Sequence, residues 1–178
     1  GKPYEAELVH ESNTFDMAIL KVKGVSGRPF FKLSSSIDLK QTRGIFVLGY
    51  PGEGSIPPTQ IERIYELART KSLTIAKKIS EAFGPIDLKL KTNKGIVNMV
   101  AELEEYGKIV QYDVKTHRGN SGGPAVTSDG IVWGMHTLSF SEQQVSAAGL
   151  LFPMRSEIEA ALKVNKSKVI WVDSPKKN

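Results

Sequence analysis

The chain has 178 residues, of which 40% are hydrophobic and 24% charged, and a composition this close to the globular average excludes collagen-like, low-complexity and wholly disordered proteins. No apolar stretch approaches the roughly 18 residues that a membrane-spanning helix needs. The chain contains no cysteine and three scattered histidines. This excludes a disulfide framework, a thiolate nucleophile and a cysteine-based zinc site, and it leaves little for a metal cluster. We expect neither a metal nor an organic cofactor.

The net charge of +5 comes in part from the C-terminal residues. The lysines concerned are Lys163, Lys166, Lys168, Lys176 and Lys177. A nucleic-acid-binding face would interleave basic residues with stacking aromatic side chains, and this stretch offers only Trp171. We therefore interpret 164–178 as a basic solvated tail and expect neither a nucleic acid nor a membrane as partner.

In the first half of the chain, the spacing of apolar residues changes once, from a strand-like to a helix-like pattern. Residues 4–9 and 17–22 are short apolar or alternating runs separated by turn residues, which predicts a hairpin. Residues 44–50 predict a buried strand that ends at a proline- and glycine-rich loop. From 59 to 83, apolar residues recur every three or four positions, so we expect a helical insertion there.

The second half returns to short strands. The ranges 95–103, 108–114, 131–137 and 148–152 have strand-like composition, and 153–163 predicts a closing helix with Pro153 in its first turn. Short strands joined by turns favour an antiparallel barrel or sandwich.

The motif with chemical content is T-H-R-G-N-S-G-G-P at 116–124. Three glycines around Ser121 permit a tight backbone that leaves the serine hydroxyl exposed and directs several N–H groups into one concavity. The N–H groups of Gly119 and Ser121 would then form an oxyanion hole, as an acyl-transfer enzyme needs. An ordinary glycine-rich turn is the alternative for this motif alone.

Upstream, the segment D-M-A-I-L begins with Asp16 at the mouth of a predicted strand. The combination of D-h-A-h-L, where h is apolar, with a distant G-N-S-G-G-P resembles the chymotrypsin-like serine proteases, particularly the disulfide-free HtrA group and the bacterial glutamyl endopeptidases. The resemblance extends from about residue 4 to 162, apart from the insertion at 55–90.

The resemblance implies a mostly β, chymotrypsin-like fold with a complete second antiparallel barrel preceded by the end of the first. We expect 1–43 to be the end of the first barrel, 44–163 the second barrel with its helical insertion and closing helix, and 164–178 the tail. It also implies that Ser121 is the nucleophile, Asp16 orients the catalytic histidine and Gly119 contributes to the oxyanion hole.

The catalytic histidine is where this sequence departs from the family pattern. The family places it a few tens of residues before the aspartate, whereas His10 lies six residues before Asp16, inside a predicted strand. We therefore expect the general base to come from a segment outside this chain, either N-terminal to it or on a second chain.

Two further residues bear on specificity. Thr116 and His136 can both donate hydrogen bonds to a carboxylate or carboxamide oxygen, which indicates Glu or Gln before the scissile bond. Their spacing from Ser121 is similar to that of glutamyl endopeptidases and of the picornavirus main cysteine proteases. A buried core histidine is the alternative for His136. The residues that follow, Thr137, Leu138 and Ser139, would bind an extended substrate as an added strand.

The sequence thus predicts a serine endopeptidase that acts on polypeptides through an acyl-enzyme on Ser121, although residues 1–178 alone would have little or no activity. The alternative is a catalytically inactive module with the protease fold that binds a peptide or protein.

Overall fold

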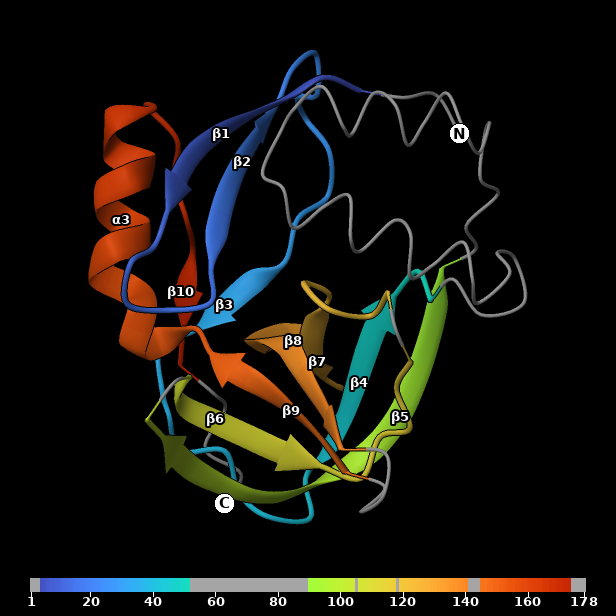
Figure 1. The fold of residues 1–178 in the computed structure, drawn as a ribbon. Helices are drawn as coiled ribbons and strands as arrows, with labels where there is room; N and C mark the ends of the chain where they lie inside the picture. Colours follow the sequence, from blue (N-terminus) through green and yellow to red (C-terminus); the bar gives the residue numbers. More distant parts are fainter. Residues whose placement is uncertain (1–3, 52–89, 105, 118, 141–144, 174–178) are drawn as a thin grey trace.

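The computed structural model describes residues 4–51, 90–104, 106–117, 119–140 and 145–173. The elements in chain order are β1 (Ala6–Glu11), β2 (Ala18–Val22), β3 (Lys32–Ser34), β4 (Gly44–Gly49), β5 (Lys91–Leu103), β6 (Gly107–Tyr112), β7 (Pro124–Thr127), β8 (Ile131–Phe140), β9 (Val145–Leu150), the 3-10 turn η1 (Phe152–Met154), α3 (Arg155–Val164) and β10 (Trp171–Val172) (Figure 1). The predicted helix at 59–83 lies outside the described residues.

Six antiparallel strands close into a barrel (Figure 1). β4 pairs with β5 and β7, β6 pairs with β5 and β9, and β8 joins β7 to β9, so the ladder returns to its starting strand. Each of the six strands is therefore paired on both sides over part of its length. The predicted mostly β fold with an antiparallel barrel is confirmed.

The barrel interior is filled by side chains that alternate along each strand between inward-facing and outward-facing positions. In β4, Ile45 and Val47 are fully buried, and their neighbours along the strand are half-buried. Trp133 on β8 and Tyr112 on β6 are the largest buried side chains of the same cluster. The core therefore packs tightly behind β8, the strand that carries His136.

A two-stranded ribbon and the C-terminal helix lie beside the barrel. β1 and β2 pair antiparallel, with Leu8 opposite Leu20, which confirms the predicted hairpin. The side of the ribbon that carries Ile19 packs against a small cluster made by Met17, Met154 and Ile158, so α3 holds the hairpin (Figure 1). The helix matches the closing helix expected at 153–163, with Pro153 in the preceding 3-10 turn.

Three short strands were not expected from the sequence. β7 follows the glycine-rich loop directly, whereas β3 and β10 are two or three residues long and pair in parallel beside β8. β10 lies within the range expected to be a tail, and the proposed domain boundaries stay a prediction. Within the described ranges, no helix is long and apolar enough to span a membrane.

Candidate active site

The serine loop is built on a turn that needs glycine. The Asn120 N–H donates to the His117 carbonyl at 3.1 Å, and Gly119 has a φ of +100°. A positive φ at the third position of a four-residue turn is typical of a type II turn, which side chains with a Cβ adopt only with strain. Gly119 therefore allows the chain to reverse immediately before Ser121.

Ser121 and Gly119 lie at the surface of the loop. Ser121 and Gly119 are exposed, whereas Asn120 between them is 1% exposed. Over the described part of the chain, neither the Ser121 hydroxyl nor the N–H groups of Gly119 and Ser121 make a hydrogen bond. These three donors are free to bind a substrate, as an oxyanion hole with its nucleophile requires.

The loop is fixed to β8 immediately after the serine. The Gly122 N–H donates to the His136 carbonyl and the His136 N–H donates to the Gly123 carbonyl, both at 2.8 Å. Gly123 also lies against β4, because a Cβ at this position would be 2.0 Å from the Leu48 carbonyl oxygen. The position of Ser121 is thus set by the backbone of His136.

The next residue along β8 holds the aspartate. The Thr137 hydroxyl donates to Asp16 Oδ2 at 2.5 Å, although the two residues are far apart in sequence. Asp16 lies in the turn between β1 and β2 and is exposed. Consecutive residues of β8 therefore anchor the two predicted catalytic residues, the serine through backbone bonds and the aspartate through a side chain.

His136 is buried, with both ring nitrogens in contact with hydroxyl groups. Nδ1 lies 2.7 Å from the Tyr112 hydroxyl and Nε2 lies 3.3 Å from the Ser139 hydroxyl. Burial lowers the pKa of His136 to about 4, with a smaller opposing effect from the backbone of Ala147. Burial also raises the pKa of Tyr112. Both side chains are therefore neutral at physiological pH.

Thr116 joins the same polar cluster. Its hydroxyl lies 2.6 Å from the hydroxyls of both Ser139 and Ser146, and Ser146 in turn donates to the Val114 carbonyl at 2.9 Å. The hydroxyl of Ser139 thus bridges Thr116 and His136 Nε2. The structure brings these two predicted specificity residues together through one exposed hydroxyl.

The remaining predicted substrate-binding residues lie on a strand edge. Residues 138–140 of β8 pair with β9 on one side, Leu138 opposite Ala147, and Thr137 lies at a register shift in this ladder. On the other side, the pairing with β7 ends at Met135. Within the described residues, this second edge carries no strand beyond Met135, and it begins beside the Asp16 contact.

His10 lies in a different environment. Its Nε2 is 2.5 Å from Glu157 Oε1 on α3. The contact recorded for Asp16 is with Thr137. The structure therefore does not pair His10 with Asp16, in keeping with the expectation that His10 is not the general base.

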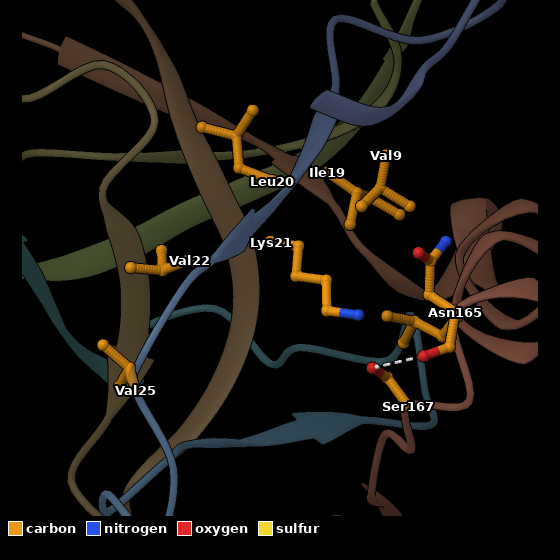
Figure 2. Close-up of a pocket in the computed structure, with 9 residues that line it drawn as sticks. Val9, Ile19, Leu20, Lys21, Val22, Val25, Asn165 and Ser167 are labelled. Carbon is orange, nitrogen blue, oxygen red and sulfur yellow. Dashed lines mark hydrogen bonds between the residues drawn. The ribbon is translucent and has the colours of Figure 1, made fainter. Parts of the chain in front are cut away.

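A separate hollow of about 250 Å³ lies between the hairpin and the end of α3 (Figure 2). Its lining residues are Val9, Ile19, Leu20, Lys21, Val22, Val25, Leu162, Asn165 and Ser167. Figure 2 shows Lys21 extending from β2 across the hollow toward Asn165. The lining is mostly aliphatic and includes no residue of the predicted catalytic site.

Comparison with known proteins agrees with this architecture. Among solved structures, the HtrA-type protease AlgW with a decapeptide has a TM-score of 0.64 and 18% identity, with 92% of this chain and 42% of that chain covered. The active form of the Rv3671c protease from M. tuberculosis has a TM-score of 0.63 and 17% identity, with 89% and 59% covered. The fold is that of the chymotrypsin-like proteases.

Sequence comparison gives the family. The model of the trypsin-like peptidase domain matches residues 1–135, so the chain belongs to this family. Serine protease Do-like HtrB of Bacillus subtilis (strain 168) is 24% identical over 153 residues, which are 86% of this chain and 28% of that protein. Serine protease HTRA1 of Xenopus tropicalis is 26% identical over 157 residues, which are 88% and 27%. The chain thus spans little more than a quarter of the length of these relatives.

Sequence reasoning missed three participants in the site. Tyr112 lies in the strand expected at 108–114, Ser146 precedes the strand expected at 148–152, and the sequence predicts that Thr137 binds substrate rather than Asp16. Tyr112 is two residues before Val114 in an alternating run, which indicates only that it faces inward. Its partner could be found only from the register that brings β6 and β8 together through β9.

Proposed function

We propose that this chain is the nucleophile-bearing part of a serine endopeptidase that prefers Gln or Glu before the scissile bond. Ser121 attacks the carbonyl carbon of the peptide bond, and the N–H groups of Gly119 and Ser121 stabilise the resulting oxyanion. Loss of one such donor costs about 3 kcal/mol of transition-state stabilisation. Asp16 orients the histidine that takes the proton from the serine hydroxyl.

The proposal rests on one observation, which is that two adjacent residues of β8 hold the serine loop and the aspartate. The backbone of His136 makes hydrogen bonds to the residues after Ser121, and the hydroxyl of Thr137 makes one to Asp16. Because these two β8 residues are adjacent, the serine loop and the aspartate are both held at the same point of β8. An ordinary glycine-rich turn would not require a distant carboxylate at this place.

The preference for Gln or Glu rests on the neutral cluster around His136. When the Tyr112 hydroxyl donates to Nδ1, Nε2 keeps its hydrogen and donates to an oxygen of the substrate side chain. The Ser139 hydroxyl, which now bridges Thr116 and Nε2, occupies the place such an oxygen would take. A neutral imidazole adds no charge attraction for a carboxylate, so we expect Gln to be cleaved at least as well as Glu.

The general base comes from a segment outside residues 1–178, on the same polypeptide or on a second chain. The outer side of the β1–β2 ribbon supports this, because Leu8, Leu20 and Val22 are 55%, 59% and 42% exposed there. Phe30 and Phe31 add further exposed apolar surface after β2. A contiguous apolar face of this kind marks a surface that another segment covers. That segment would also cover the exposed Asp16.

The test is cleavage of a peptide library that varies the residue before the scissile bond among Gln, Glu, Leu and Lys. It compares the full-length protein, residues 1–178 alone, and a Ser121→Ala variant of each. We expect cleavage by the full-length protein, concentrated after Gln or Glu and abolished by Ser121→Ala. Residues 1–178 should retain at most a small fraction, because a triad without its histidine keeps only the contribution of the oxyanion hole and binding.

Two outcomes would change the proposal. If the full-length protein bound peptides without cutting any, the chain would be a non-catalytic binding module with the protease fold, and the free edge at 137–140 would be its peptide site. If it cut after Leu or Lys as readily as after Gln, the catalytic part would stand and His136 would be a core residue only.

A further inference from the structure

The turn that carries Asp16 is organised by one hydroxyl group. Ser12 Oγ accepts hydrogen bonds from the N–H groups of Thr14 and Phe15 at 3.1 and 2.9 Å. The Ser12 N–H donates to the Met17 carbonyl at 3.0 Å, which closes the turn from its other side. Asp16 thus lies between two residues, Phe15 and Met17, whose backbone bonds converge on Ser12.

Glu157 of α3 fixes the direction of that hydroxyl. Ser12 Oγ donates to Glu157 Oε2 at 3.0 Å, and the other carboxylate oxygen contacts His10 Nε2 at 2.5 Å. A serine hydroxyl has a single hydrogen, so donating it to Glu157 leaves the oxygen lone pairs for the Thr14 and Phe15 amides. One carboxylate therefore contacts both the end of β1 and the start of the turn.

The charge of Glu157 and the packing of the neighbouring Ile158 both help to hold the turn that carries Asp16. The hydrogen bond from His10, with that from Ser12, keeps the pKa of Glu157 below its ordinary value, so its carboxylate is ionised at neutral pH. Ile158, the next residue of the helix, packs with Met17 in the cluster beneath the turn. Further along α3, the hollow of Figure 2 lies between the ribbon and the helix end. The first turn of α3 is thus where the Asp16 turn is held.

We propose that Glu157 is a positioning residue for Asp16, acting through Ser12 and the backbone of the turn. This inference rests on the proposed protease function, in which Asp16 orients the general base. Asp16 is then held at two points, by Thr137 at its carboxylate and by α3 through its backbone. Removal of the Glu157 carboxylate frees the Ser12 hydroxyl to rotate, and the carboxylate of Asp16 then samples orientations that no longer direct the histidine.

The experiment uses the full-length protein and four variants. Glu157→Ala removes the contact, Glu157→Gln keeps hydrogen-bonding groups without the charge, and Ser12→Ala removes the intermediate hydroxyl. Glu159→Ala is the matched control, because Glu159 is on the same helix and pairs only with Arg155 on the exposed surface within the described residues. For each variant, kcat and KM are measured on one Gln-containing peptide, and amide hydrogen exchange is measured at Thr14 and Phe15.

We expect Glu157→Ala and Ser12→Ala to lower kcat by about 10- to 100-fold with KM within about twofold, the size of effect expected from a small misplacement of a catalytic group. Exchange at Phe15 should accelerate in both. Glu157→Gln should recover most of the lost kcat, and Glu159→Ala should match the wild type in both measurements.

Three results would overturn the proposal. They are an unchanged kcat in Glu157→Ala, a loss of the same size in Glu159→Ala, and an unchanged exchange rate at Phe15. If the wild-type protein itself cleaves no peptide, the proposed function fails separately. In that case the exchange rates alone decide whether Glu157 holds the turn.

Discussion

The side chain on which the proposed Gln or Glu preference depends is His136, and its properties come from two neighbours. Its ring is 1% exposed, with Tyr112 on one nitrogen and Ser139 on the other. A buried imidazole without a charged partner is more stable neutral than protonated. Burial of this kind is expected for a histidine that only fills the core. It is equally compatible with a neutral ring that donates a hydrogen bond to the uncharged amide of a substrate glutamine.

Tyr112→Phe tests the first of these neighbours, since it removes the hydroxyl and keeps the ring. The buried Nδ1 of His136 loses its partner, so we expect the free energy of unfolding to fall by about 1–3 kcal/mol. Cleavage after Gln should fall relative to cleavage after Leu, measured as the ratio of kcat/KM values. Tyr106→Phe is the control, because no hydrogen bond is recorded for the Tyr106 hydroxyl in the described part of the chain. Equal unfolding midpoints for the two variants would contradict the role of Tyr112.

The low pKa of His136 also predicts a pH dependence of stability. The pKa is about 4 in the folded chain and 6.5 in the unfolded one, so the unfolded chain binds the proton more readily. The stabilisation is complete above pH 6.5 and is lost as the pH falls from there to about 4, a change of roughly 3 kcal/mol. Denaturant titrations between pH 4 and 8 measure it. His136→Gln lacks this titration and should show a shallower slope; parallel curves for both proteins would contradict the assignment.

At the scale of elements, the Ser121 loop is held by its fit against β4. A Cβ on Gly123 would meet the Leu48 carbonyl oxygen at 2.0 Å, and a backbone atom cannot move aside as a flexible side chain can. We expect Gly123→Ala to lower the free energy of unfolding by at least about 3 kcal/mol, and to lower any Ser121-dependent activity further. Gly44→Ala, on β4 itself and facing open space, should change stability by less than about 1 kcal/mol. Similar unfolding curves for the two variants would show that the loop adapts.

The strands and the helix also show which elements a local sequence pattern can predict and which it cannot. Alternation in β4, with Ile45 and Val47 inward, and the three- and four-residue spacing around Ile158 predict a strand and a helix because burial repeats along each element. β3 and β10 have two or three residues each, too few to show any period. Their pairing beside β8 depends on contacts between distant segments, which no local pattern records.

At the scale of the whole molecule, the barrel is closed whereas the β1–β2 ribbon exposes an apolar side. Residues of the candidate site from both parts meet at β8, where Thr137 contacts Asp16 and the backbone of His136 holds the serine loop. The sequence motifs identified Asp16, Ser121 and Gly119 as candidates, because each belongs to a recognisable local pattern. The contact between Thr137 and Asp16 and the link from Glu157 to Ser12 join residues distant in sequence, so the sequence alone could not predict them.

The central claim is that Ser121 is an activated nucleophile in a site shared with Asp16. The most direct measurement is covalent labelling of the full-length protein with a serine-reactive fluorophosphonate probe, located by peptide mapping and compared with Ser121→Ala. We expect a single modified residue, Ser121, labelled faster in the wild type than in Asp16→Ala. Absence of labelling in the full-length protein, or labelling that persists in Ser121→Ala, would contradict it.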